Sequence, residues 1–212
     1  INENHSRAPN LNPVKAEQRK IVVDRIPKGT ILELYAGKGY LTEEVYADKA
    51  SKVILVDNDK ASLRKADQRL KGKVKREIYA GDNRKWIREE MPNQNLSNLV
   101  LVDFDAFGTP TETMSEFFNN YHIKKPLYIA ITDGSSMRYA LGKHRDARDM
   151  AADHYRAKIP KKDMGTLHGQ VSMMDQFLEK EGRSHHFKAE PISIAKSQYR
   201  TIYMAYRLSP SN

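Results

Sequence analysis

Cysteine is absent from this chain of 212 residues, which excludes disulfides, thiolate metal sites and cysteine nucleophiles. The histidines do not have the spacing of metal ligands, so we expect no metal. Long apolar stretches are missing too. None approaches the roughly 20 residues that cross a bilayer, and the polar first residues do not resemble a signal peptide. These absences predict a cytoplasmic protein that has no membrane partner.

Acidic residues are the scarcer charges, because 27 Asp and Glu stand against 36 Lys and Arg, a formal net charge of +9. Such a balance favours a polyanionic partner, since neutralised phosphates release condensed counterions. The basic segment 138–162 is expected to contact nucleic-acid phosphates through Arg138, Lys143, Arg145, Arg148, Lys161 and Lys162. A second basic segment, 64–76, fits a solvated helix face as well as it fits a contact surface.

Strand and helix patterns alternate along the chain, which predicts an α/β fold with a mostly parallel sheet and helices on both faces. A C-terminal hairpin would add an antiparallel edge. The expected strands are Thr30–Leu34, Lys52–Val56, Glu77–Ala80, Leu99–Val102, Pro126–Thr132 and the hairpin pair His186–Ala195 and Thr201–Leu208. The expected helices are Val14–Asp24, Leu41–Ala50, Lys60–Leu70, Lys85–Met91, Thr111–Asn119 and His168–Lys180.

The same patterns predict how the chain is divided. Residues 1–14 are polar and contain two prolines, which break helices, and they are interpreted as an arm or lid. Residues 15–212 are interpreted as a single domain, a length that supports a full hydrophobic core. Within this domain, residues from about 134 to 165 have no strand pattern and are interpreted as a basic helical insertion.

A glycine turn follows the first strand and carries the strongest functional signal. The strand delivers Glu33, and Gly37 and Gly39 then allow the backbone to approach a ligand. Asp57 ends the next strand, 20 residues after Gly37, where a carboxylate commonly binds ribose hydroxyls. Asp82 follows the third strand, where it can meet an adenine amino group. The competing interpretation is that these carboxylates cap helices.

A dinucleotide is the main alternative cofactor for this turn. Its fingerprint needs a third glycine at position 42, which is Thr42 here. Glu33 would also repel a phosphate, whereas it would attract a cationic ligand. The fourth strand then delivers Asp103 and Asp105, followed by Phe107, to the same edge of the sheet. Together these features indicate group transfer from a cationic nucleoside cofactor to a planar acceptor.

The segment Glu33-Leu-Tyr-Ala-Gly-Lys-Gly39 resembles the first motif of the class I methyltransferases, which have a Rossmann-like fold and use S-adenosylmethionine. The resemblance extends from Thr30 to Leu208 and implies a seven-stranded sheet. It implies that Glu33 and the backbone of Tyr35, Ala36, Gly37 and Gly39 hold the methionine part of the cofactor. It further implies that Asp57 and Asn58 hold the ribose, that Asp82 and Asn83 hold the adenine, and that Asp103 orients the loop or contacts the methionine amino group.

The segment Asp103-Phe-Asp-Ala-Phe-Gly-Thr-Pro110 resembles the corresponding motif of the tRNA guanine-N2 dimethyltransferase family, with Ala106 in place of a proline. Ala130-Ile-Thr-Asp-Gly134 resembles a second segment of that family. Asn12-Pro13 resembles a pair before a helix that closes over the cofactor, so Asn12 is a lid candidate. The family's additional C-terminal domain has no counterpart in this sequence, which leaves a partner subunit or a homodimer open.

Asp105 and Phe107 have chemical roles that suit an exocyclic base amine. The lone pair of such an amine is delocalised into the ring, and a carboxylate that accepts its N–H bond aligns the nitrogen and takes up its proton. Phe107 would stack on the base. These roles predict an N-methyltransferase that acts on a base amine. The resemblance to the guanine-N2 family implies RNA rather than DNA, with tRNA guanine N2 as the acceptor. The alternatives are methylation of adenine N6 or cytosine N4 in DNA, a small-molecule methyltransferase, and a non-catalytic nucleic-acid-binding subunit.

Overall fold

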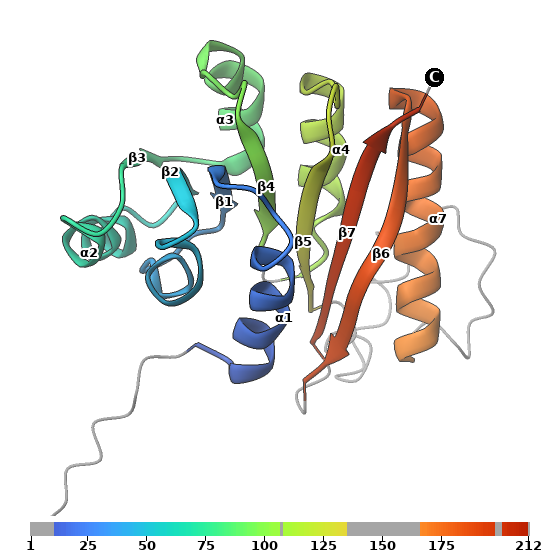
Figure 1. Ribbon diagram of the computed structural model, residues 1–212, viewed down its shortest axis with the longest axis horizontal. Helices are drawn as coiled ribbons and strands as arrows, with labels where there is room; N and C mark the ends of the chain where they lie inside the picture. Colours follow the sequence, from blue (N-terminus) through green and yellow to red (C-terminus); the bar gives the residue numbers. More distant parts are fainter. Residues whose placement is uncertain (1–10, 107, 135–165, 198–200, 212) are drawn as a thin grey trace, which may run out of the picture.

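A computed structural model describes residues 11–106, 108–134, 166–197 and 201–211. Seven strands form one sheet in the order β3-β2-β1-β4-β5-β7-β6 (Figure 1). The strands are β1 (Gly29–Leu34), β2 (Ala50–Asp57), β3 (Arg76–Ala80), β4 (Leu99–Phe104), β5 (Leu127–Asp133), β6 (Phe187–Lys196) and β7 (Ile202–Pro210). β1 to β5 pair in parallel, while β7 is antiparallel to β5 and to β6. The predicted mostly parallel sheet with an antiparallel hairpin is confirmed.

Helices cover both faces of this sheet, as the sequence predicts (Figure 1). One face packs against α1 (Pro13–Val23), the short helix η1 (Thr42–Tyr46) and α2 (Lys60–Leu70). The other packs against α3 (Asn83–Glu89), the 3-10 turn η2 (Met91–Asn93), α4 (Thr111–Asn120) and α7 (Leu167–His185). None of the helices in the described ranges is long and apolar enough to cross a bilayer.

The central strands β1 and β4 are buried on both faces, which explains why their sequences are nearly continuous apolar runs. Side chains alternate between the two faces. Leu32 and Leu34 join the core under α3, α4 and α7, whereas Ile31 joins the core under α1, η1 and α2. Glu33 alternates with Leu32 and Leu34 and stands beside Asp103 in the β1–β4 register. The alternation therefore places two carboxyl groups side by side under α1 and η1.

The helix predicted over Leu41–Ala50 is wrong in its second half. The structure has the short π-helical turn η1, in which the Ala47 amide donates to the Thr42 carbonyl at 2.8 Å. β2 already begins at Ala50, which pairs with Gly29 of β1. The helix therefore ends at Tyr46, because the chain must reach its pairing position in β2 at Ala50. Most of the predicted arm and nearly all of the predicted basic insertion lie outside the described residues.

Candidate active site

The glycine turn after β1 is held in a strained conformation by the helices on one face of the sheet. Tyr35 has φ 63°, a left-handed value that is costly for a tyrosine, and Gly37 and Gly39 have φ 55° and 72°. The Asn83 side chain accepts a hydrogen bond from the Tyr35 amide at 3.3 Å, and the Tyr35 hydroxyl contacts Thr113 Oγ1 at 2.5 Å. α3 and α4 thus fix the path of the turn.

Gly39 is also fixed by close packing, because a Cβ atom there would lie 2.9 Å from the Cβ of Ala66 in α2. Gly37 and Gly81 differ from it. A Cβ atom at either position would meet no heavy atom of the described residues within 4 Å. These two glycines follow β1 and β3, so open space adjoins both turns at the carboxyl edge of the sheet.

Asp57 ties the end of β2 to the glycine turn. Its Oδ2 accepts from the Gly37 amide at 2.8 Å and its Oδ1 accepts from the Asp59 amide at 2.8 Å. Asp57 is half-buried, and the adjacent Asn58 is exposed. The sequence predicted that Asp57 and the glycine turn meet, and the structure brings them together.

The residues predicted to hold adenine lie at the start of α3. Asp82 is exposed and caps this helix by accepting from the Lys85 amide at 2.9 Å. Asn83 is buried and supports Tyr35 through its side chain. Asp82 therefore caps α3, as the competing interpretation of the sequence proposed. Its contact with adenine stays a prediction.

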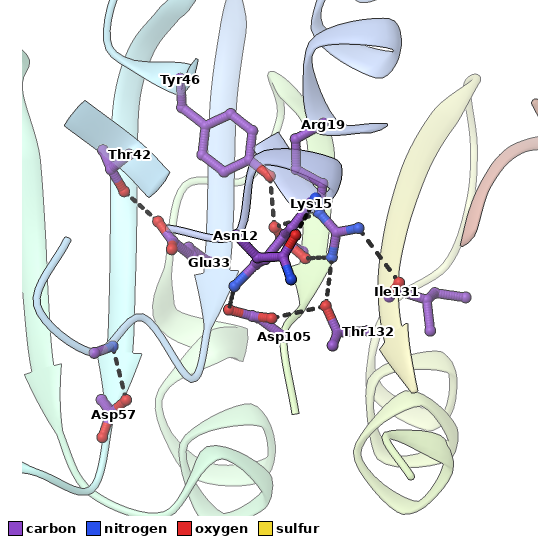
Figure 2. A network of polar contacts seen from close by, with 12 residues as sticks. Asn12, Lys15, Arg19, Glu33, Thr42, Tyr46, Asp57, Asp105, Ile131 and Thr132 are labelled. Carbon is purple, nitrogen blue, oxygen red and sulfur yellow. Dashed lines mark hydrogen bonds and ion pairs between the residues drawn. The ribbon is translucent and has the colours of Figure 1, made fainter. Parts of the chain in front are cut away.

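Glu33 lies beneath the turn and is only 1% exposed. The Thr42 hydroxyl donates to Glu33 Oε2 (Figure 2). Burial, and after it the charge of Asp103, raises the pKa of Glu33 to about 8. At neutral pH this carboxyl group is therefore protonated in the free chain.

Asp103 is completely buried and carries a two-pronged ion pair with Arg19 of α1, which is also completely buried. Arg19 Nε donates to Asp103 Oδ2 at 3.1 Å and Nη2 donates to Oδ1 at 2.7 Å. The Tyr46 hydroxyl of η1 donates to the same carboxylate. Arg19 also reaches β5, where it donates to the Ile131 carbonyl at 3.3 Å and to Thr132 Oγ1 at 2.9 Å. Asp103 therefore connects β4 to α1 and η1, and Arg19 extends the network to β5.

Asp105 follows β4 and has different partners from Asp103 (Figure 2). The Lys15 ammonium of α1 donates to Oδ2. The Thr132 hydroxyl donates to Oδ1 at 2.7 Å. Burial raises the pKa of Asp105, and the Lys15 ammonium acts against that rise. A carboxylate with a directed hydrogen bond on each oxygen thus lies beside the glycine turn.

Four of the most informative residues here were missed by sequence reasoning: Lys15, Arg19, Tyr46 and Thr132. A signal did exist in α1, since Lys15, Arg19 and Val22 share one helix face and place charge on an otherwise apolar stripe. Asn12 caps α1 by accepting from the Val14 amide at 3.0 Å, and Pro13 occupies the first helical position. The expectation that Pro13 breaks a helix is therefore wrong, because proline is favoured at that position.

Several predicted site residues lie outside the described residues. They are the aromatic residue Phe107 and the basic residues Arg138, Lys143, Arg145, Arg148, Lys161 and Lys162. Their roles stay predictions from the sequence.

No family model and no curated protein matches this sequence. Solved structures do match its fold. Trm1 from Pyrococcus horikoshii, solved with S-adenosyl-L-methionine, is 16% identical with a TM-score of 0.68, over 95% of this chain and 56% of that chain. Trm5b from Pyrococcus abyssi is 13% identical with a TM-score of 0.58, over 95% and 50%. TYW2 from P. horikoshii in complex with MeSAdo is 12% identical with a TM-score of 0.58, over 94% and 63%.

The chain therefore has the Rossmann-like fold of class I methyltransferases. It spans between half and two thirds of the length of these three neighbours. At such identities the likeness concerns the fold, and the function has to be argued from the site.

Proposed function

We propose that this chain is an S-adenosylmethionine-dependent N-methyltransferase that acts on an exocyclic amine of a nucleic-acid base, with RNA as the favoured acceptor. The observation that carries the proposal is the Asp105 carboxylate, which lies beside a glycine turn at the carboxyl edge of the sheet. The finer proposal, guanine N2 in tRNA, rests on the resemblance of Asp103–Pro110. It gains support from the fold likeness to Trm1, a tRNA guanine-N2 dimethyltransferase.

The residues at this edge suit a cationic nucleoside. Open space adjoins Gly37 and Gly81, and Asp57 stands between their turns because it pairs with Ala80 of β3 and accepts from Gly37. In the proposal, the turn backbone from Tyr35 to Gly39 holds the methionine part above Glu33. Asp57 and Asn58 hold the ribose, and Asp82 and Asn83 hold the adenine. The carboxylates give this edge the sign of charge that a sulfonium group needs.

The bound cofactor would supply a methyl group that is made electrophilic by its sulfonium sulfur. Asp105 accepts an N–H hydrogen bond from the base amine and aligns the nitrogen lone pair with the methyl carbon. When the methyl group passed to nitrogen, the C–S electron pair would stay with sulfur, and Asp105 would take the proton that leaves nitrogen. Phe107 stacks on the base in this proposal.

Labelled-methyl transfer to total RNA and to total DNA, followed by nucleoside analysis, tests the proposed function. We expect label in RNA, in an N2-methylated guanosine. Label in DNA as N6-methyladenine or N4-methylcytosine would replace the RNA proposal with the DNA alternative. The absence of label from both would contradict a nucleic-acid methyltransferase.

Cofactor binding should release a proton. Glu33 is protonated in the free chain below its raised pKa of about 8, and a cation bound above it favours the ionised form. The affinity for S-adenosylmethionine should therefore rise from about pH 5 to pH 8, by up to about tenfold per pH unit. Titration calorimetry in buffers of different ionisation enthalpy counts the released protons.

The Glu33→Gln variant is the matched control, because it keeps the shape of the side chain and removes its proton equilibrium. Its cofactor affinity should be weaker and nearly independent of pH over this range. If the variant releases as many protons on cofactor binding as the native chain, the released proton comes from a group other than Glu33.

A basic surface between α2 and β3 supports a nucleic-acid partner independently. A hollow of about 610 Å³ lies there, lined by Lys60, Leu63, Arg64, Asp67, Arg76, Ile78 and Ala80. Arg76 is paired with Asp67, whereas Lys60 and Arg64 have no ion pair among the residues that the structure describes. Ala80 pairs with Asp57, so the hollow adjoins the proposed cofactor site. Two unpaired cations at this place suit the phosphates of a nucleic acid.

The double variant Lys60→Gln/Arg64→Gln should bind tRNA more weakly at every salt concentration. Loss of two phosphate contacts should reduce the slope of log affinity against log salt by about 2. Fluorescence anisotropy over a salt series measures this slope. The control is Lys180→Gln/Lys188→Gln, which removes two exposed charges from α7 and β6 at the opposite edge of the sheet. An equal change of slope in the control would show that the weaker binding comes from the lower net charge and not from contacts of Lys60 and Arg64 with phosphates.

A further inference from the structure

The two oxygens of Asp105 are held from opposite sides by different elements. Thr132 of β5 donates to Oδ1 at 2.7 Å. Its hydroxyl also accepts from Arg19 Nη2 at 2.9 Å, which leaves the single hydroxyl proton for Asp105. Lys15 of α1 donates to Oδ2. In Figure 2 this second contact lies on the side of Asp105 that faces Glu33 and Asp57, the side of the glycine turn.

Lys15 is placed by the start of α1. The Asn12 cap and Pro13 fix the first turn of this helix, from which the Lys15 side chain reaches Asp105. The two side chains are 16% and 14% exposed, so the pair is largely shielded from water. An ion pair that is shielded in this way is screened much less than a surface pair. The ion pair between Lys15 and Asp105 is thus part of the site and differs from a solvent-exposed surface ion pair.

The other groups around Asp105 leave Lys15 as its compensating charge. Arg19 of α1 is engaged by Asp103 of β4 in a two-pronged pair. Glu33 of β1 is a further acid and offers no positive charge. Tyr46 of η1 donates a hydrogen bond to Asp103, and Tyr203 of β7 is an uncharged phenol near Asp105. Thr132 of β5 is neutral. Among the described residues, Lys15 is the one cation that directly contacts Asp105.

We propose that Lys15 is a positioning residue for the methyl transfer described above: its ammonium group fixes Oδ2 of Asp105 and balances the charge of that carboxylate, which makes it ready to accept the amine N–H. The inference rests on the proposed function. A carboxylate oxygen has two lone pairs. Lys15 therefore holds one lone pair of Oδ2, and the proposal assigns the other to the amine N–H. Thr132 has the complementary role, because its hydroxyl donates to the other oxygen, Oδ1, from the β5 side.

Lys15→Met removes the charge and keeps most of the length of the side chain. Without the ammonium group, burial and the charge of Asp103 are opposed by Arg19 alone, so the pKa of Asp105 should rise further. The acid limb of the pH profile of kcat/KM should move to higher pH by about one unit or more. Lys15→Arg should restore the position of the limb, while the control Lys20→Met, an exposed lysine on the same helix, should leave it in place.

A second readout does not depend on activity. Carbon-13 NMR follows the titration of the Asp105 carboxyl carbon, which is assigned by its loss in Asp105→Asn. The titration should move to higher pH in Lys15→Met and in Lys15→Gln, and thermal melts report whether each variant is folded. If the native chain transfers no methyl group to RNA or DNA, the proposed function fails, and the carboxyl titration still decides whether Lys15 governs Asp105.

Two results would overturn the role of Lys15. The first is an unchanged acid limb together with an unchanged carboxyl titration in folded Lys15→Met. The second is a uniform increase of kcat/KM at every pH without a shift of the limb, because that result would make Lys15 a plug that blocks the amine.

Discussion

Replacement of Asp105 by Asn should lower the rate of methyl transfer by about 10² to 10⁴-fold and leave the affinity for S-adenosylmethionine nearly unchanged. The amide keeps the shape of the carboxyl group and an oxygen for Thr132, but it cannot accept a proton from the base amine. The loss should therefore fall on the chemical step. Single-turnover transfer measures the rate, and titration calorimetry measures the affinity.

Asp24→Asn provides the control for this variant, since Asp24 is an exposed carboxylate at the end of α1, away from the sheet edge. It should transfer methyl groups at the native rate. Full activity in Asp105→Asn would show that another group takes the amine proton. Equal loss of cofactor affinity and of rate would instead place Asp105 in the cofactor site.

Replacement of Arg19 by Met should lower the free energy of unfolding by about 3–5 kcal/mol, the usual cost when a buried ion pair loses one partner. The substitution leaves Asp103 charged in a fully buried position, next to Glu33 in the sheet register. It also removes the donor that orients the Thr132 hydroxyl. Denaturant unfolding measures the change at equilibrium.

The double variant Arg19→Met/Asp103→Leu separates the ion pair from the packing of the helix. With both charges gone, no unpaired charge remains buried, and the double variant should recover much of the stability lost by Arg19→Met. A double variant that is no more stable than Arg19→Met would assign the loss to the packing of α1. In that case the pair between Arg19 and Asp103 would not be what holds α1 on the sheet.

Asp103, Asp105 and Glu33 together leave no unbalanced charge in the site, whereas Asp57 and Asp82 have no ion pair among the described residues. Arg19 offsets Asp103, and Lys15 offsets Asp105. Glu33 remains, and its raised pKa leaves it neutral at physiological pH. A cationic cofactor would then be met by a carboxyl group that becomes an anion as the cation arrives. In the proposed function the Lys15–Asp105 pair serves the acceptor and Glu33 serves the cofactor, so the experiments on Lys15 and on Glu33 test different parts of the proposal.

The sequence predicted the sheet and the glycine turn because their signals are local. An apolar run ending in an acid, such as Ile31 to Glu33, marks a buried strand and delivers a carboxylate at a known position. The charged residues on the apolar face of α1 are a local signal too, but they do not identify the acids with which they pair. Arg19 and Asp103 are 84 residues apart, and Lys15 and Asp105 are 90 residues apart. Nothing in the composition of α1 fixes which strand it crosses.

The turn after Gly39 shows the same limit at shorter range. Helix periodicity continues past Tyr46, but the pairing of Ala50 with Gly29 draws the chain into β2. Tertiary pairing therefore decides where the helix ends. Asp82 illustrates a different difficulty, because one carboxylate can cap a helix and still face a ligand. The helix cap is visible in the structure, whereas the second role needs the ligand.

Titration calorimetry of S-adenosylmethionine into the native chain shows whether the glycine turn holds this cofactor. We expect one molecule bound per chain, with heat that is lost when Asp57→Ala removes the acid that holds Gly37. We also expect no binding of a dinucleotide, whose pyrophosphate the charges of Asp57 and Asp82 would repel and whose fingerprint needs a glycine where this chain has Thr42. No heat with S-adenosylmethionine, or equal binding by the native chain and Asp57→Ala, would contradict a cofactor site at the glycine turn.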